Sequence, residues 1–475
     1  MSGLSRFIGL LLLPIYTRIF SVEDYGVIDI FSVFTNLIIV TATLRLSTSI
    51  SRYYSEKDRG FNTKQLCSSI LFFVIFINTF VFLLLWLFSS KISFFITGKL
   101  NLEHLVLLSS ISACFTSISK IPMMILRRKR KIIIFSTIQT ISSIIYAFSS
   151  LSLIFIYDYG INSIFLGMII SNIFILFCSL YAVRDELGLN LNKIAIKTAL
   201  KYSLPLVPGK YFMWLNAQLN RIMLLSLIGL SGVGLFAIGS RVASILQLFL
   251  TIFQRAWNPF SIEIINQKGS DFIYKKALTY YLGITFISGI ILSISSPAIL
   301  YLLTSQEFYS GRYVVPWIIG TFIINGSSRI INIGTVINEQ MSYNSKGEFI
   351  AFIANLVISY FLILFLGFKG AAIGMFLAQI ISKLYIWNAT QKISDIKFEN
   401  KKIYILVLVY LICSISINSQ TIIFGDSIYR NTIPFIICFI GIIFMYKISI
   451  DSLLKNQFKI IFKVYFKKGK KAIFK

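Results

Sequence analysis

The sequence predicts an all-α integral membrane protein of about fourteen transmembrane helices, arranged as two six-helix lobes followed by two C-terminal helices. Composition, the length of the apolar runs and a weak internal repeat predict this fold class. Of the 475 residues, 56% are hydrophobic and 13% are charged, and the mean hydropathy is +0.81. So little polar surface cannot cover a core in water, so the bilayer must be the solvent of this chain.

Apolar runs of 18 or more residues recur along the whole chain, and each is long enough to cross a hydrocarbon core of roughly 30 Å as a helix. The first run has no small-residue cleavage site behind it, so we expect a retained helix and not a signal peptide. The predicted spans lie near residues 4–20, 27–51, 67–90, 104–126, 132–156, 161–183, 204–229, 233–254, 277–303, 313–338, 347–367, 370–391, 403–424 and 431–450.

Two internal matches have nearly the same offset. Residues 24–32 resemble 232–240 when Gly26 is laid on Gly234, an offset of 208, and residues 167–171 resemble 378–382, an offset of 211. Six spans separate the copies, so both enter the membrane from the same side as parallel repeats. The predicted domains are an N-terminal lobe (1–183), a cytoplasmic linker (184–202), a C-terminal lobe (203–391), helices 13 and 14 (392–450) and a basic amphipathic tail (451–475).

Lysine and arginine gather in the loops after even-numbered spans, for example in the run at 127–131. The positive-inside rule places these loops and both termini in the cytoplasm. This setting explains the net charge of +27 without nucleic acid. In the tail, Lys455, Lys459 and Lys463 are one helical turn apart between apolar residues, which predicts a helix lying on anionic membrane lipids. A docking site for a partner enzyme is the alternative for this tail.

The sequence contains no pattern typical of a cofactor or metal site. The five cysteines are scattered with no CxxC pair, so neither a disulfide framework nor a metal site follows. No GxxxxGK[ST] motif is present, so we expect energy from an ion gradient or from removal of product and not from ATP.

The charges inside the spans are almost all basic, and Asp29 is the one acid that lies clearly inside a span. Ion pairing within the protein is therefore not expected to account for the bases, and several must line a wet cavity that attracts an anion. These bases are Arg18, Arg45, Lys120, Lys210, Arg221, Arg241, Arg329 and Lys383.

Helical spacing groups these side chains on faces. Arginine suits phosphate oxygens, and neighbouring amides suit sugar hydroxyls, so a phosphorylated glycan would use both. The faces are Lys210, Trp214, Gln218 and Arg221 on span 7, Asn325, Arg329 and Asn332 on span 10, and Arg45 with Arg52 on span 2.

Several of these residues have a plainer explanation. Lys120, Lys383 and Arg18 lie near span ends, where long stems reach the headgroups. Arg52 and Arg255 are equally well explained as positive-inside residues. Most of the tryptophans lie near span ends as interfacial anchors, and only Trp214 is kept as a candidate for sugar stacking.

Four segments resemble the polysaccharide flippases of Wzx type, which share a superfamily (MOP) with the lipid II flippase and the multidrug (MATE) exporters. They are LLLLPIYTRIFSVEDYG at 10–26, LRLSTSISRYYSE at 44–56, YSLPLVPGKY at 202–211 and RVASILQLFLTIFQRAWNPFSIE at 241–263. By matching motifs, the resemblance implies a cationic cavity that includes Arg18, Arg45, Arg52, Arg241 and Arg255. The amino terminus is shorter than is usual in the family.

The resemblance also implies a MATE-like fold that moves undecaprenyl-diphosphate-linked oligosaccharides across the bacterial inner membrane, for O-antigen or capsule synthesis. Implied partners are the polysaccharide polymerase, the chain-length machinery and a coupling ion, proton or sodium. The predicted substrate-binding residues are Arg18, Arg45, Arg52, Lys210, Trp214, Gln218, Arg221, Arg241, Arg255, Asn325 and Arg329.

Two other functions stay open. A multidrug exporter of the same fold would handle cationic drugs, which a basic cavity repels. A membrane-embedded glycan polymerase or ligase would need catalytic loops on the outer face, where the loops are short and the single histidine, His104, lies at a span end. We therefore expect a transporter and not an enzyme.

Overall fold

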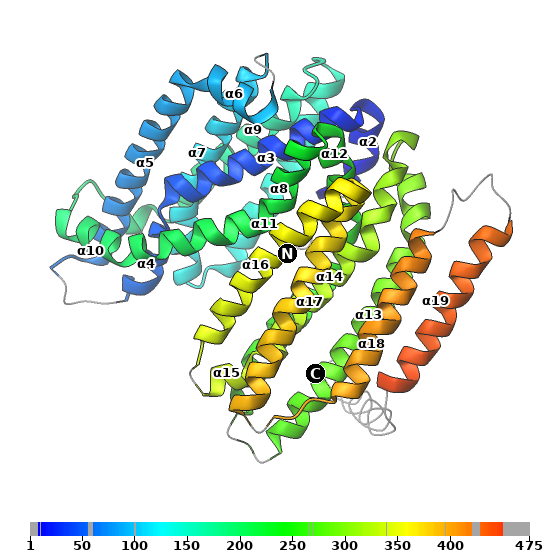
Figure 1. Cartoon of the computed structure of the whole chain (residues 1–475). Coiled ribbons are helices and arrows are strands. Elements are labelled where there is room, and N and C mark those ends of the chain that lie inside the picture. Colours follow the sequence, from blue (N-terminus) through cyan, green and yellow to red (C-terminus); the bar gives the residue numbers. More distant parts are fainter. Residues whose placement is uncertain are drawn as a thin grey trace, which may run out of the picture. The chain divides into compact units, whose positions relative to one another are not determined.

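The computed structural model describes residues 8–9, 11–55, 60–98, 101–265, 267, 269–338, 340–394, 396–419 and 428–449. Within these residues the regular structure is helical and no strand is present (Figure 1). Eleven of the described helices are long and apolar enough to cross a membrane. The all-α membrane fold class is thereby confirmed.

Three predicted spans are not among these eleven helices. The first falls partly on residues outside the described set, which begins its regular structure with α2 (Leu13–Ile19). The seventh is α11 (Val207–Leu227), a helix with many polar residues. The last is α19 (Ile428–Ser449), in which the apolar helix Ile433–Ser449 is shorter than 18 residues. The number fourteen stays a prediction, and the tail at 451–475 lies outside the described residues.

Packing divides the chain into two compact units. Unit 1 comprises Met1–Ala237 with Leu303–Phe308, and unit 2 comprises Ile238–Leu302 with Tyr309–Lys475. The division lies inside α12 (Leu230–Glu263), because α10 and α11 pack on helices of unit 1. The predicted domains follow the repeat and not the packing, and their boundaries stay a prediction.

Unit 1 is built around α7, which packs against α3, α5 and α9 (Figure 1). Local sequence sets where helices begin: Ser21 and Asp24 form a capping box at the start of α3, and Asn62 and Gln65 form one at the start of α5. Besides α2 and α11, the elements are α3 (Val22–Thr43), α4 (Leu46–Tyr53), α5 (Thr63–Leu87), α6 (Ser89–Thr97), α7 (Glu103–Arg128), α8 (Ile132–Phe155), α9 (Asn162–Ala182), η1 (Arg184–Glu186), α10 (Lys193–Ser203) and η2 (Leu204–Leu206).

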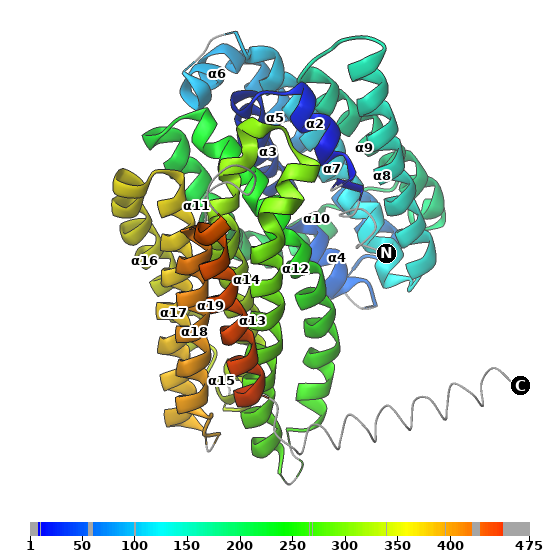
Figure 2. The ribbon, with the colours of Figure 1, turned by 90° about the vertical axis from the view of Figure 1, so that its right-hand side faces the viewer.

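In unit 2, α17 packs against α14 and α16, and Figure 2 shows the long helices of this unit running alongside one another. Buried Tyr410 of α18 stacks on Phe286 of α13 at 4.5 Å between ring centres and donates a 2.6 Å hydrogen bond to the Pro316 carbonyl. The elements after α12 are α13 (Ser270–Leu303), η3 (Gln306–Val314), α14 (Val315–Ile331), α15 (Ile333–Ile337), α16 (Ser342–Leu366), α17 (Phe368–Ile393), α18 (Asn400–Asn418) and α19.

The glycines that defined the predicted repeat touch each other's helices within unit 1. A Cβ added to Gly26 of α3 would lie 2.0 Å from the carbonyl oxygen of Leu230, and one added to Gly234 of α12 would lie 2.1 Å from that of Val22. Leu230 follows Val22 by 208 residues, as Gly234 follows Gly26. The crossing of α3 and α12 is therefore reciprocal and has the offset that the sequence predicts.

A second correspondence lies within the helical hairpins of the two units. Gly167 of α9 packs on Ser150 of α8, where an added Cβ would lie 3.0 Å from the serine Cβ. Gly374 of α17 packs on Ser359 of α16, where it would lie 2.7 Å from the serine Cα. The serines are 209 residues apart and the glycines 207. Packing therefore gives α17 a register about one turn from the offset of 211 expected from sequence.

Candidate functional site

A break between α3 and α4 creates the first part of the candidate site. Leu44 and Arg45 have φ values of 41° and 54°, in the left-handed region that non-glycine residues rarely adopt. The Arg45 carbonyl accepts hydrogen bonds from the Thr48 amide at 2.9 Å and the Thr48 hydroxyl at 2.6 Å, which holds the start of α4. Predicted span 2 is therefore divided into two helices, α3 and α4, and Arg45 lies at the break between them.

Arg45 lines a pocket of about 440 Å³ inside unit 1, within the range of roughly 300–1,000 Å³ typical of small-molecule sites. Its charged lining residues are Arg45, Lys120, Arg127 and Lys210, and no carboxylate is among the described lining residues. Its polar lining residues are Thr43, Ser47, Thr48, Thr116, Ser119, Gln139 and Asn172, and its apolar ones are Val40, Met123, Met124, Phe135 and Ile175.

One face of α7 supplies much of this lining. Thr116, Lys120 and Arg127 follow each other at four and seven residues, which keeps them on one side of a helix. The Arg127 guanidinium carbon lies 4.3 Å from the centre of the Phe135 ring of α8, a cation–π contact. Pro122 has no amide hydrogen, so α7 lacks one backbone hydrogen bond at the level of the pocket.

Asn172 brings α9 into the pocket. Its side-chain amide donates to the Ser112 hydroxyl of α7 at 3.1 Å. This bond uses the amide nitrogen of Asn172, and its amide carbonyl can still accept a hydrogen bond. The pocket thus combines cations, which bind phosphate, with hydroxyls and amides, which bind sugar hydroxyls. It is therefore complementary to a phosphate attached to a sugar.

The basic run at the end of α7 divides between this pocket and the neighbouring elements α4 and η1. While Arg127 lines the pocket, Arg128 donates to the Ser51 hydroxyl at 2.5 Å and Lys129 pairs with Glu186 at 2.7 Å. Burial, and then the nearby Glu186 carboxylate, raise the pKa of Tyr54 to about 12, so its hydroxyl stays protonated at neutral pH. Two of these bases therefore connect the end of α7 to α4 and to η1.

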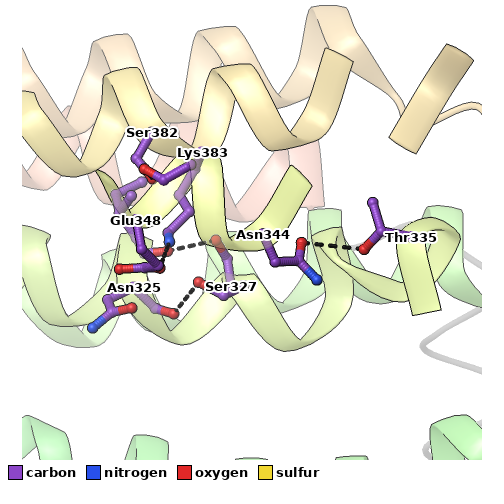
Figure 3. A network of polar contacts seen from close by, with 10 residues as sticks. Asn325, Ser327, Thr335, Asn344, Glu348, Ser382 and Lys383 are labelled. Carbon is purple, nitrogen blue, oxygen red and sulfur yellow. Dashed lines mark hydrogen bonds and ion pairs between the residues drawn. The ribbon is translucent and has the colours of Figure 1, made fainter. Parts of the chain in front are cut away.

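The side chains predicted to share one face of α11 lie at two separate positions in the structure. Lys210 lines the pocket, whereas the Arg221 Nε donates to Asp29 Oδ2 at 2.6 Å and its Nη1 donates to Gln218 at 3.3 Å. The expectation that ion pairing does not account for the buried bases is wrong for Arg221. It is also wrong for Lys383, which pairs with Glu348 at 2.7 Å (Figure 3).

Trp214 lies outside the pocket. Half-buried, it packs against an apolar cluster that includes Val27, Phe31 and Phe165, and its indole Nε1 has no hydrogen-bond partner among the described residues. This packing favours a structural contribution over sugar stacking.

The other predicted site residues do not line the pocket of unit 1. Arg18 of α2 and Arg52 of α4 are exposed, and the Arg52 guanidinium carbon lies 5.9 Å from the Tyr53 ring centre. The remaining four belong to unit 2: Arg241, half-buried on α12; Arg255, exposed on α12; and Asn325 and Arg329, exposed on α14. Their assignment to substrate stays a prediction.

Sequence reasoning missed Arg127 and did not include Lys120 among the site residues. In the sequence, Arg127 belongs to a basic run of the kind that orients a loop, and Lys120 lies near a span end, where a lysine can snorkel. Their seven-residue spacing, with Thr116 four residues before Lys120, was the signal that could have placed them on one face.

Comparison with known proteins identifies the family. The family model described as "Polysaccharide biosynthesis protein" matches residues 15–309. The chain belongs to this polysaccharide biosynthesis family. The match covers α3 to α13, and hence every helix that lines the pocket.

Two relatives of this polysaccharide biosynthesis protein come from Haemophilus influenzae. The "Lsg locus putative protein 1" is 23% identical over 330 residues, covering 67% of this chain and 78% of the relative. An "uncharacterized membrane protein" is 22% identical over 367 residues, covering 72% of this chain and 85% of the relative.

Among solved structures, the lipid II flippase MurJ in an inward closed conformation has a TM-score of 0.70 at 18% identity, covering 94% of this chain and 97% of that one. An inward-facing multidrug resistance MATE transporter of the MOP superfamily has a TM-score of 0.66 at 14% identity, covering 82% and 94%. The polysaccharide biosynthesis protein therefore has the fold shared by these flippases and transporters, and is a multi-pass membrane protein.

Proposed function

We propose that this protein is a flippase that moves undecaprenyl-diphosphate-linked oligosaccharide repeat units across the bacterial inner membrane for synthesis of a cell-surface polysaccharide. The observation that carries the proposal is the pocket of unit 1, in which Arg45, Lys120, Arg127 and Lys210 are the charged lining residues. Family membership supports the polysaccharide, and the fold supports transport.

The diphosphate is the part of the substrate that this pocket suits. Each hydrogen bond from an ammonium or guanidinium to a phosphate contributes about 1.5–3 kcal/mol. The hydroxyls of Thr116 and Ser119 and the amides of Gln139 and Asn172 are then placed for the first sugar. In this proposal the polyprenyl tail stays in the lipid while the lobes rock to expose the head group outside.

The proposal includes an orientation and partners. Both termini and the basic loops lie in the cytoplasm, as the positive-inside rule predicts. The repeat unit is made on the cytoplasmic side, and a polymerase with its chain-length machinery takes it on the outer side. Either removal of this product or a proton or sodium gradient drives the cycle.

Translocation in proteoliposomes tests the function. The probe is a fluorescent undecaprenyl-diphosphate oligosaccharide, and the variant is Arg45→Ala with Lys210→Ala. Loss of two charge-assisted contacts should lower the rate of translocation by at least about tenfold. The matched control is Lys193→Ala with Lys197→Ala, two exposed lysines of α10 in the same unit outside the pocket, which should leave the rate unchanged.

Three results would count against this assignment. An equal rate for the pocket variant and its control would remove the pocket from the mechanism. Absence of transport by the folded intact protein, with export of a cationic dye, would favour the multidrug exporter. Glycosyl transfer by the purified protein would favour the polymerase or ligase.

A further inference from the structure

Unit 2 repeats the framework that forms the pocket of unit 1. In unit 1, α7 is followed by the hairpin α8–α9 and packs on α9; in unit 2, α14 is followed by the hairpin α16–α17 and packs on α17. Ser150 and Ser359, which receive the packed glycines of the two hairpins, are 209 residues apart. The two hairpins can therefore be compared residue by residue.

Unit 2 has polar residues in a similar arrangement. On the first helix of the hairpin, Glu348 lies 209 residues after Gln139, and on α14 Asn325 and Arg329 are four residues apart, as Thr116 and Lys120 are on α7. On the second helix of the hairpin, where the glycines differ by 207, Gln379 corresponds to Asn172. The Gln379 side-chain oxygen is buried and has no hydrogen-bond partner among the described residues.

The two polar side chains on α14, Asn325 and Arg329, are exposed and not packed in the core. Most of this helix is buried, yet Asn325 and Arg329 are exposed one turn apart. An arginine facing hydrocarbon inside a span costs from about 2.5 to more than 10 kcal/mol. The Arg329 guanidinium is therefore expected to reach water, lipid headgroups or a polar ligand.

Glu348 is held with its carboxylate outward. One carboxylate oxygen pairs at 2.7 Å with Lys383, whose side chain is 4% exposed, while the Glu348 side chain is 45% exposed. The other oxygen, Oε2, has no partner among the described residues. Figure 3 draws Asn325 in the same network of polar contacts as Glu348 and Lys383. Buried Lys383 thus fixes the direction of a carboxylate that has one oxygen to offer.

The change in charge between the two frameworks indicates a different ligand group. The unit 1 lining contains four bases and no described acid, whereas this framework of unit 2 contains one arginine, amides and a carboxylate paired with Lys383. A carboxylate paired with an ammonium attracts phosphate less than four unpaired bases do, and its oxygens accept strong, short hydrogen bonds from hydroxyl groups. Amides donate to and accept from the same groups.

We propose that Asn325, Arg329 and Glu348 form a glycan-binding face in unit 2, in which Glu348 accepts hydrogen bonds from sugar hydroxyls and Lys383 is its positioning residue. This proposal rests on the proposed function and concerns the sugars of that substrate.

Binding of two lipids separates this proposal from the flippase assignment. The protein in nanodiscs is titrated with undecaprenyl diphosphate alone and with the lipid-linked oligosaccharide extracted from the producing cells. The intact protein should bind the oligosaccharide form at least about tenfold more tightly, as one or two hydrogen bonds to a charged group predict. Glu348→Gln should remove most of this preference and leave the affinity for the bare diphosphate unchanged.

A second variant and a matched control complete the design. Glu348→Gln leaves Lys383 buried without a counter-charge, so Glu348→Gln with Lys383→Met keeps the test valid if the single variant does not fold. The control is Glu399→Gln, which also removes a carboxylate paired with a lysine of unit 2, Lys276 at 2.9 Å, at the N-cap of α18. It should retain the full preference for the oligosaccharide form.

Two outcomes overturn the glycan-binding face while the flippase assignment stands: equal affinity of the intact protein for both lipids, or an undiminished preference in the Glu348 variants. Failure of the intact protein to bind either lipid would instead overturn the proposed function. Loss of binding to the bare diphosphate in Glu348→Gln would show a structural ion pair and also overturn the proposal.

Discussion

The position of the Arg45 side chain depends on a helix break at Leu44 and Arg45 inside a membrane-spanning segment. Each left-handed non-glycine residue costs about 1–2 kcal/mol, and this strain lies where the Arg45 guanidinium reaches the pocket. Strain of this kind tends to persist at functional sites because the surrounding structure enforces it.

The backbone at Arg45 predicts an unusual ranking of two variants. Arg45→Gly should be more stable than Arg45→Ala by about 1 kcal/mol, because glycine adopts a φ of 54° without strain. At Lys197, exposed in the middle of α10, the order should reverse by a similar amount, about 1 kcal/mol. Thermal unfolding of the four purified variants in one detergent gives both differences, and the same order at both positions would contradict the strain.

Sequence could place some of the pocket residues and not others. Arg45 and Lys210 were chosen because a base inside a span needs water, and both line the pocket. Arg221 obeys the same rule but satisfies it through Asp29, 192 residues away, and helical spacing contains no information about such a partner. Which of two buried bases finds an acid is decided by packing.

At the scale of helices, α11 joins these two solutions. Besides carrying Lys210 to the pocket and Arg221 to Asp29, it is fixed to α3 by a 2.8 Å hydrogen bond from the Tyr211 hydroxyl to Thr41. Its polar residues explain why this helix is less apolar than the other spans although the sequence pattern predicts a span there.

The helical class and most spans could be predicted because apolar length alone decides them. Helix breaks and registers could not, because tertiary contacts such as the one at Gly374 decide them.

The crossing of α3 and α12 should not tolerate a methyl group. Gly26→Ala would place a Cβ 2.0 Å from the Leu230 carbonyl oxygen, so the helices must separate. A loss of about 1–3 kcal/mol is expected from such overpacking, measured as a fall in the thermal midpoint and in the yield of monodisperse protein.

The control for Gly26 is Gly209→Ala. Gly209 of α11 has a helical φ and open space around its Cα, so alanine there should keep or raise the thermal midpoint. Equal tolerance of alanine at both positions would contradict the close crossing.

A half-buried carboxylate at the start of α18, Glu399, makes stability depend on pH. Burial alone would raise the pKa of Glu399, but hydrogen bonds from Lys276 and Thr279 and the charges of Lys276 and Lys402 outweigh it and lower the pKa. A lowered folded-state pKa stabilises the protein above the ordinary glutamate value of about 4.3, and this contribution is lost as the pH falls further, through the folded value.

The thermal midpoint of Glu399→Gln should therefore lie below that of the intact protein at pH 7. The gap should shrink as the pH is lowered from about 5 to about 3, because the intact protein then also loses the charge. Differential scanning measurements across this range provide the test, and a gap that is constant with pH would mean that the ion pair does not stabilise the fold.

For the whole molecule, the charge distribution predicts a topology that can be tested at two loops separated by one helix. Asp158 and Asp185 lie before and after α9. With the termini inside, an impermeant thiol reagent added to intact cells should label Asp158→Cys and not Asp185→Cys, in a background where the five native cysteines are replaced by serine. Labelling in the opposite pattern would invert the orientation, and both positions should react after the cells are opened.

The reciprocal contact of α3 and α12 also bears on how such a chain could have arisen. Gly26 touches Leu230, and Gly234 touches Val22. Gly234 follows Gly26 by 208 residues and Leu230 follows Val22 by 208, so the contact maps onto itself when the halves are exchanged. This is the geometry of an isologous interface, in which one patch binds an identical patch of a second copy. A single ancestral lobe with one such glycine would have been able to dimerise through it. Gene fusion would then have turned a symmetric dimer into one chain whose two halves could diverge in sequence.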